Sequence, residues 1–133
     1  MEATREAVAA EGDDPLTHRI IGAAIEVHRS IGPGLLESTY EACLCEELRV
    51  LGLSFRRQVE VPVVYRGVDV GVGYRLDLVV ESSVLLELKA VERLEQIHHA
   101  QILTYMRLSK IRTGLLINFN TAVLKNGIKR FVL

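Results

Sequence analysis

Residues 74–90, YRLDLVVESSVLLELKA, place three charges within two apolar runs. With the two-residue period of a β-strand, the first run turns Asp77 away from its leucine neighbours, and the second turns Glu87 and Lys89 to one common face. Residues 81–83 between the runs are polar and typical of a turn, which predicts an antiparallel hairpin. We expect this hairpin to bring Asp77, Glu87 and Lys89 together.

Two interpretations of these charges are open at this point. An unpaired carboxylate is costly to bury, so carboxylates in the middle of a sheet are normally paired, bound to a metal ion or placed at the mouth of a cleft. Alternatively, the charged face is solvated, and Glu87 and Lys89 form a surface ion pair that contributes little to stability. The hairpin alone does not distinguish a site from a solvated face.

The composition is that of one globular domain. The chain has 133 residues, of which 49% are hydrophobic and 25% charged, and this balance excludes general disorder. The formal net charge is −1, so bulk charge does not attract nucleic acid. Aromatic residues make up only 5% of the chain, which leaves little surface for stacking on single-stranded bases. Any contact with nucleic acid must therefore come from a local patch.

The sequence also predicts a cellular location. Cys43 and Cys45 match neither a disulfide framework nor a zinc-site spacing, which favours a reducing intracellular compartment. The N-terminal residues lack the apolar core of a signal peptide, and no run is long enough to span a membrane. We therefore expect a soluble cytoplasmic protein that does not associate with membranes.

The pattern predicts a tail followed by one domain. Residues 1–15 are expected to form a mobile N-terminal tail, and residues 16–133 the domain, with Thr17 as the N-cap of its first helix. The expected elements are helices at residues 17–31 and 35–51, strands at 55–64, 68–80 and 84–90, a helix at 92–109, and strands at 114–119 and 128–133. Pro62 predicts an edge strand or a bulge. The order α-α-β-β-β-α-β-β predicts a three-layer α/β domain, with a mixed sheet flanked by helices.

Motifs in both halves of the domain resemble those of one nuclease superfamily. Asp77, followed after a short hairpin by the E-x-K motif at residues 87–89 and then by a helix and a strand, resembles the PD-(D/E)XK nuclease superfamily. Residues 34–40, GLLESTY, match the pattern of the small bacterial and archaeal GxxExxY proteins, which belong to that superfamily and are similar to its RecB-like nucleases and archaeal Holliday junction resolvases. The resemblance covers residues 16–133 and implies a restriction-endonuclease-like fold. Leu76 stands where the motif has proline, a change that removes no ligand.

The resemblance implies a metal-dependent active site. The carboxylates of Asp77 and Glu87 and the backbone carbonyl of Leu88 would bind Mg²⁺ or Mn²⁺. Glu37 matches the helical acidic ligand of the family, and Lys89 would be the catalytic lysine. Oxygen ligands of this kind suit Mg²⁺, which lowers the pKa of a bound water during phosphodiester hydrolysis, while the lysine orients that water or stabilises the transition state.

Gln101 and Tyr105 lie four residues apart in the predicted helix at residues 92–109. They resemble the Q-x-x-x-Y element of RecB-like nucleases, and the resemblance implies that they lie beside the metal site. A glutamine in the middle of a helix and a half-buried tyrosine are also common packing residues. Both interpretations stay open.

Basic residues are scattered along the chain, and a solvated surface is their default interpretation. A rim that contacts phosphates would need the fold to gather four of them, namely Arg56, Arg57, Lys129 and Arg130. The sequence alone does not show whether the fold does so.

The first functional hypothesis is a metal-dependent nuclease that hydrolyses phosphodiester bonds, with DNA as the expected nucleic-acid substrate. The second is a non-catalytic module that retains the nuclease fold and binds nucleic acid or a protein partner, which the near-neutral charge and the few aromatic residues favour. The third is a structural domain with a buried ion network. A homodimer is an open alternative to a monomer, because a domain of this size would recognise two-fold-related DNA only as a dimer.

Overall fold

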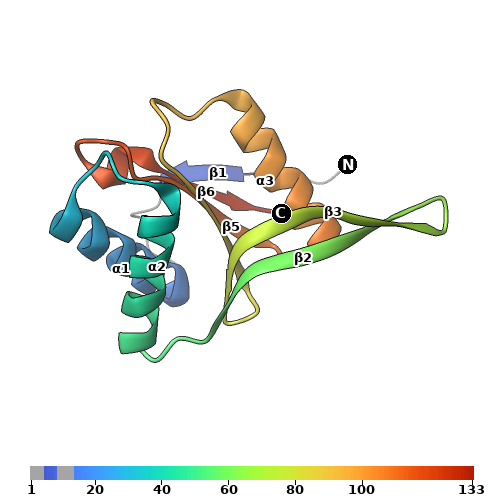
Figure 1. Ribbon diagram of the computed structural model, residues 1–133, viewed down its shortest axis with the longest axis horizontal. Coiled ribbons are helices and arrows are strands. Elements are labelled where there is room, and N and C mark those ends of the chain that lie inside the picture. The colour runs from blue at the N-terminus through green and yellow to red at the C-terminus, as the bar shows by residue number, and fades with distance from the viewer. Residues whose placement is uncertain (1–4, 9–13) are drawn as a thin grey trace.

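A mixed six-stranded sheet with the strand order β1-β6-β5-β4-β3-β2 forms the middle of the protein (Figure 1). The computed structural model describes residues 5–8 and 14–133. Its elements are β1 (Arg5–Val8), α1 (Pro15–Ile31), α2 (Glu37–Val50), β2 (Phe55–Tyr65), β3 (Val68–Val80), β4 (Val84–Lys89), α3 (Gln96–Ser109), β5 (Thr113–Asn118), the 3₁₀ helix η1 (Leu124–Gly127) and β6 (Ile128–Val132). From α1 onward, the helices and strands follow the predicted order, with η1 inserted before β6.

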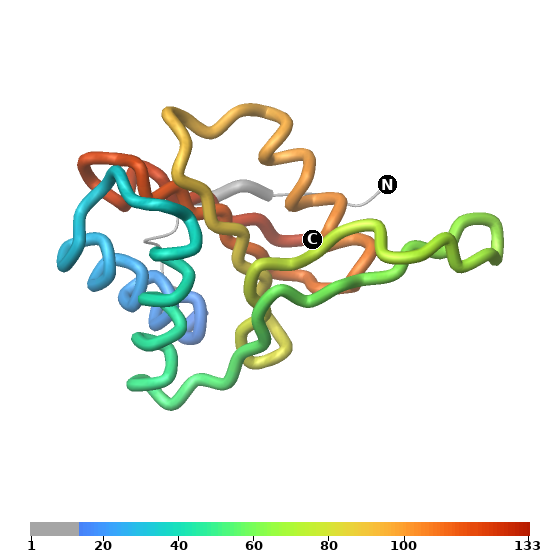
Figure 2. The backbone as a smooth tube through the Cα atoms, viewed as in Figure 1, coloured from blue at the N-terminus to red at the C-terminus, as the bar shows by residue number. Residues whose placement is uncertain are grey.

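Helices cover both faces of the sheet, which confirms the predicted three layers (Figure 2). Alternate residues of β3 and β4 face the two helical layers. Leu78 and Leu86 pack in the core formed with α1 and α2, whereas Val79 and Leu85 pack in the core formed with α3. The central strands are therefore buried on both sides.

Part of the expected N-terminal tail is described by the structure. Residues 5–8 form β1, which pairs antiparallel with β6. Their short sequence has no apolar alternation that would predict a strand. The rest of the expected tail, residues 1–4 and 9–13, lies outside the described residues.

The N-cap of helix α1 lies three residues before the predicted one. Asp14 is the N-cap, and its carboxylate accepts hydrogen bonds from the backbone N–H groups of Leu16 (3.1 Å) and Thr17 (3.3 Å). Pro15 suits the first helical position because its missing N–H needs no partner there. The prediction that Thr17 is the N-cap is wrong. Thr17 lies inside the first turn, and its hydroxyl donates a hydrogen bond to the carboxylate of Asp14 over 2.7 Å.

The hairpin of β3 and β4 is antiparallel, as predicted, and Leu78 pairs with Leu86. On its other side, β4 runs parallel to β5, with Lys89 beside Asn118. Strand β4 therefore lies in the centre of the sheet, and Lys89 is its last residue.

Among residues 5–8 and 14–133, no helix is long and apolar enough to cross a membrane.

Strands β2 and β3 continue past the body of the protein as a two-stranded ribbon (Figure 1). Strand β2 is the edge of the sheet, and its register shifts on both sides of Pro62, as that proline predicted. We call residues 62–72 the outer ribbon. Five of its large apolar side chains are 60–65% exposed: Val64, Tyr65, Val68, Val70 and Val72.

Candidate active site

Two hydrogen bonds join Asp77 to the neighbouring residues Glu87 and Leu88 of β4. The backbone N–H of Asp77 donates to Glu87 Oε2 over 3.1 Å, and the backbone N–H of Leu88 donates to Asp77 Oδ2 over 2.8 Å. These donors would face carbonyls in a regular antiparallel ladder, but the recorded pairing ends at Leu78↔Leu86. The predicted hairpin therefore brings the two carboxylates together where β3 and β4 separate.

Burial makes these two carboxylates hard to ionise. Burial raises the pKa of Asp77, although the hydrogen bond from Leu88 opposes this shift. Burial and the nearby charge of Asp77 raise the pKa of Glu87 from 4.5 to about 8. The positive charge of Lys89 lowers both pKa values, and the negative charge of Glu37 raises both. The pair is thus arranged to favour a cation or a proton between the strands.

A hollow of about 480 Å³ opens beside this pair. Its walls come from α2, β2, β3 and β4, and its lining residues are Glu37, Ser38, Glu41, Gln58, Asp77 and Leu88. We call this hollow the acidic pocket, because three of these residues carry carboxylates. Glu37 and Leu88, which lie more than fifty residues apart in the chain, both line this pocket because the fold brings α2 next to β4.

Glu37 and Lys89 reach the same region from α2 and β4. Glu37 is the first residue of α2, is exposed, and accepts a hydrogen bond from the backbone N–H of Ala90 over 3.3 Å. Lys89 is half-buried, and its carbonyl accepts a hydrogen bond from the N–H of Phe119 (2.9 Å). The fold thus brings the acidic residue of residues 34–40 next to the E-x-K motif.

Neither Tyr105 nor Gln101 lines the acidic pocket, but the charges of Asp77 and Glu87 act on Tyr105. Burial raises the pKa of Tyr105, and the negative charges of Glu87 and Asp77 add to this shift. The ring of Tyr105 stacks on Tyr74 with 4.8 Å between centroids. Gln101 is exposed on α3. The roles expected for Tyr105 and Gln101 stay predictions, with the surroundings favouring that of Tyr105.

The chain belongs to a known superfamily by comparison with family models. Residues 14–131 match the model described as the PD-(D/E)XK nuclease superfamily. The chain is a member of that superfamily. Comparison with curated proteins and with solved structures gave no match. Membership of the GxxExxY proteins stays a prediction that rests on residues 34–40.

PD-(D/E)XK nucleases typically use divalent metal ions, and the donor set of this chain fits such an ion. Asp77 and Glu87 offer carboxylate oxygens, and Mg²⁺ is usually bound through one or two carboxylates with water and substrate completing its shell. The raised pKa values of both groups indicate that a positive charge between them would be favourable. Within the part of the chain that the structure describes, no three His, Cys, Asp or Glu side chains are grouped as metal ligands. The candidate metal site thus has two carboxylates, those of Asp77 and Glu87, that contact each other's strand directly.

Sequence analysis missed Glu41, which lies one turn after Glu37 on α2. Glu41 is only 7% exposed and lines the acidic pocket. Its carboxylate accepts hydrogen bonds from Arg57 Nε (3.1 Å), Arg57 Nη2 (3.0 Å) and Gln58 Nε2 (2.7 Å). The four-residue spacing of the two glutamates, which places them on one helical face, was the signal that could have found it.

Asn118 is a second residue whose position the sequence did not predict. It is 2% exposed, its Oδ1 accepts from the backbone N–H of Val91 (3.1 Å), and its Nδ2 donates to the carbonyl of Val91 (3.0 Å). Because Asn118 lies beside Lys89 in the sheet, these bonds fix the backbone just after the E-x-K motif.

The proposed basic rim does not form. Arg56 and Arg57 are in β2, and Lys129 and Arg130 are in β6. These two strands lie four positions apart in the sheet. Arg57 pairs with Glu41, and Arg130 lies 3.5 Å from the carboxylate of Asp14. The expectation failed because residues that are similar in type belong to strands far apart in the sheet.

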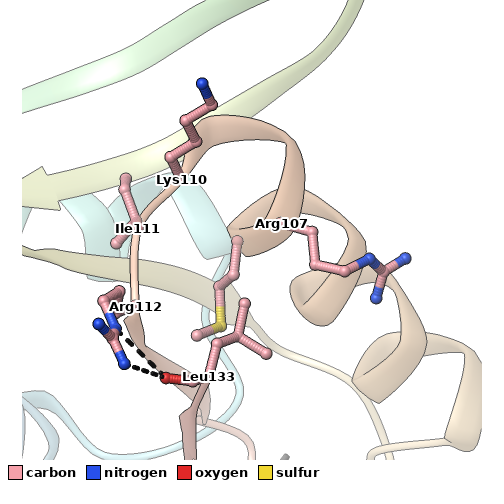
Figure 3. Close-up of a pocket in the computed structure, with 6 residues that line it drawn as sticks. Arg107, Lys110, Ile111, Arg112 and Leu133 are labelled. Carbon is pink, nitrogen blue, oxygen red and sulfur yellow. Dashed lines mark hydrogen bonds between the residues drawn. The ribbon is translucent and has the colours of Figure 1, made fainter. Parts of the chain in front are cut away.

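Another hollow, of about 540 Å³, lies at the C-terminal end of α3 (Figure 3). It contains three cations, but the side chains of Arg107 and Lys110 point in different directions, and Arg112 Nη2 donates to the carbonyl of Leu133 over 3.2 Å. It also lies at the far end of the sheet, since Thr113 pairs with Val84 rather than with Lys89. These cations do not converge on one ligand.

Proposed function

We propose that this protein is a metal-dependent nuclease that hydrolyses phosphodiester bonds in nucleic acid, with DNA as its substrate. The observation that carries the proposal is the pair formed by half-buried Asp77 and buried Glu87, joined through the backbone of two strands beside Lys89. Membership of the nuclease superfamily supports a nucleic-acid substrate. The acidic pocket supports an ion site, because the carboxylates of Glu37 and Asp77 both line it.

Asp77, Glu87, Glu37 and the carbonyl of Leu88 are the proposed ligands of Mg²⁺ or Mn²⁺. When bound, this ion lowers the pKa of a water molecule and neutralises charge on the phosphate. Hydrogen bonds hold both carboxylates in place. The N–H of Leu88 donates to Asp77, and the N–H of Asp77 donates to Glu87. The two strands therefore pre-organise the oxygens before substrate binds.

Lys89 acts on the phosphate during hydrolysis. Its ammonium group donates hydrogen bonds to a phosphate oxygen and stabilises the charge that develops there. The oxygen of water forms a bond to phosphorus, the phosphorus–oxygen ester bond breaks, and the leaving oxygen gains a proton while water loses one. The net reaction adds one water molecule across the ester bond. Tyr105 is a candidate contact to the substrate, because it lies close enough to Glu87 and Asp77 for their charges to raise its pKa.

The decisive experiment measures cleavage and metal binding separately. Duplex, single-stranded and branched DNA and RNA are incubated with protein and Mg²⁺, and Lys89→Ala is compared with Lys125→Ala, an exposed lysine in η1. We expect cleavage by wild type and by Lys125→Ala but not by Lys89→Ala. Calorimetry with Mn²⁺ should show binding by the wild type. Cleavage that survives Lys89→Ala, or the lack of Mn²⁺ binding at millimolar concentration, would contradict the proposal.

A second candidate is a non-catalytic module that retains the nuclease fold. The outer ribbon favours it, because five large apolar side chains are exposed there and such surfaces often contact other proteins, including a second copy of the chain. Filter binding of DNA over a range of salt concentrations separates the two functions. Tight binding without cleavage in any metal favours the module, and sedimentation would show whether the protein is a homodimer.

A further inference from the structure

Two consecutive residues of β2 bind the same buried carboxylate. Arg57 and Gln58 both donate to Glu41, with three N–O distances between 2.7 and 3.1 Å. Successive side chains of a strand normally point to opposite faces of the sheet. A regular strand would therefore turn one of these two residues away from Glu41. We call Glu41, Arg57 and Gln58 the Glu41 cluster.

The backbone of Gln58 explains how both residues reach Glu41. Its φ of +49° lies in the left-handed region, which is uncommon for a residue other than glycine. The flanking pairs Arg57↔Leu78 and Val59↔Leu76 keep one register, so the distortion is a local rotation rather than an inserted residue. A strained conformation of this kind persists only where surrounding contacts hold it, and such positions are concentrated at functional sites.

The same register places Gln58 opposite Asp77. Both residues line the acidic pocket. The carboxylate of Glu41, paired with the guanidinium of Arg57, can only accept hydrogen bonds, so the amide nitrogen of Gln58 must face it. The amide oxygen therefore faces away from Glu41. No described residue donates a hydrogen bond to that oxygen, which leaves an acceptor beside Asp77.

We propose that Gln58 orients the attacking water through Oε1, and that Glu41 and Arg57 are positioning residues that fix the direction of its amide. This inference rests on the proposed nuclease function. A neutral amide does not take up a proton, so Gln58 accepts one O–H of the water and leaves a lone pair directed at phosphorus, while the proton itself passes to solvent. In this assignment Glu41 acts through Gln58 and is not a metal ligand, since three of the roughly four acceptor sites of its carboxylate already accept hydrogen bonds from Arg57 and Gln58.

Kinetic variants test the role of the amide oxygen. Gln58→Met keeps the length of the side chain but removes the acceptor, and we expect kcat to fall about 10- to 100-fold with KM and Mn²⁺ affinity within about threefold of wild type. Gln96→Met makes the same change at an exposed position of α3 and should leave kcat unchanged. An unchanged kcat in Gln58→Met, or an equal loss in Gln96→Met, would overturn the assignment.

A glycine variant separates function from folding. Gln58→Gly accepts a positive φ without strain, so the melting temperature should be unchanged or raised while kcat falls as far as in Gln58→Met. A merely structural role predicts the reverse, namely that activity follows the melting temperature. Full activity in a stable Gln58→Gly protein would exclude any role of the side chain in positioning water.

The role of Glu41 is tested by coupling and by metal affinity. If Glu41 acts through Gln58, the double variant Glu41→Gln/Gln58→Met should lose no more kcat than Gln58→Met alone. Glu41→Gln should bind Mn²⁺ within about threefold of wild type, whereas Asp77→Asn should lose at least about 100-fold. A loss of Mn²⁺ affinity in Glu41→Gln as large as that in Asp77→Asn would make Glu41 a ligand and overturn the proposal.

A crystal structure with Mn²⁺ decides the question without turnover. We expect an ordered water at about 2.6–3.2 Å from Gln58 Oε1, with Nε2 still facing Glu41. Direct contact between Oε1 and the ion, or the lack of any water at Oε1, would refute the role given to Gln58. If wild type binds Mn²⁺ but cleaves nothing, the nuclease proposal fails, and this measurement still reports on the Glu41 cluster.

Discussion

The two ends of the β2–β3 ribbon reverse the usual placement of polar and apolar residues. At the inner end, Asp77 lies between Leu76 and Leu78, which are 2% and 0% exposed. At the outer end, Tyr65 and Val70 are 65% and 61% exposed. The same ribbon therefore places a half-buried carboxylate between two buried leucines at one end and apolar side chains in water at the other.

The carboxylate at the inner end and the exposed apolar side chains at the outer end have different physical consequences. The half-buried carboxylate of Asp77 is costly to remove from water, and a hydrogen bond from the N–H of Leu88 holds it at the acidic pocket, an arrangement typical of active sites. A two-stranded ribbon such as residues 62–72 is marginally stable on its own, so its side chains contribute little to the stability of the domain. Substitutions at the inner end should change chemistry or stability, and matched substitutions at the outer end should change neither.

The largest difference is expected for two aspartates of β3. Asp77→Asn should lower Mn²⁺ affinity by at least about 100-fold and abolish cleavage, because an amide is a poor ligand for a hard cation. Asp69→Asn, on the outer ribbon, should leave both unchanged, since an amide oxygen can still accept the hydrogen bond from the N–H of Gly71 (2.8 Å). Calorimetry and a cleavage assay measure the two effects. Equal losses in both variants would remove the distinction between the ends.

Stability should separate the ends nearly as sharply. Leu78→Ala removes a side chain that is 0% exposed and should lower the free energy of unfolding by about 2–5 kcal/mol. Val70→Ala, in the same strand but 61% exposed, should change it by less than about 0.5 kcal/mol. Urea denaturation measures both values. A cost above about 1 kcal/mol for Val70→Ala would show that a partner, for example a second copy, covers the outer ribbon.

Local features of the sequence predicted the fold and the proximity of Asp77 and Glu87 in the candidate site. The apolar periodicity of residues 74–90 depends only on neighbouring residues, so it gave the hairpin that joins Asp77 to Glu87. The motif at residues 34–40 placed Glu37 near this pair, and the hydrogen bond from Ala90 agrees with that placement. The order of helices and strands followed from the same periodicities.

Contacts between distant elements could not be predicted in this way. The Glu41 cluster depends on a left-handed backbone at Gln58, which no pattern of residue types indicates. The pairing of β1 depends on the open edge of β6, and the basic rim does not form because β2 and β6 lie four positions apart in the sheet. Asp14 displaced Thr17 as the N-cap because both residue types suit that position.

Removing the charge of Glu87 should stabilise the protein while it removes metal binding. Burial and Asp77 disfavour its ionised form, and Glu87→Gln keeps an oxygen that can accept from the N–H of Asp77. We expect the free energy of unfolding at pH 8.5 to rise by about 1 kcal/mol. Glu60→Gln removes an exposed carboxylate of β2, 3.7 Å from Arg75, and should shift stability by less than about 0.5 kcal/mol. Destabilisation by Glu87→Gln would show that its charge is compensated within the fold.

The smallest expected effect is a pH dependence at Glu81, an exposed carboxylate where β3 ends. Glu81 Oε2 accepts hydrogen bonds from the Ser54 N–H (2.6 Å) and hydroxyl (2.7 Å), and these bonds lower its pKa from 4.5. Because the folded pKa is depressed, the ionised group stabilises the fold at pH values above 4.5, and this contribution is lost as the pH falls through the lowered value. The melting temperature of Glu81→Gln should therefore lie slightly below that of wild type at pH 7, and the difference should disappear in acid. A difference that persists at low pH would assign the effect to the shape of the side chain instead of its charge.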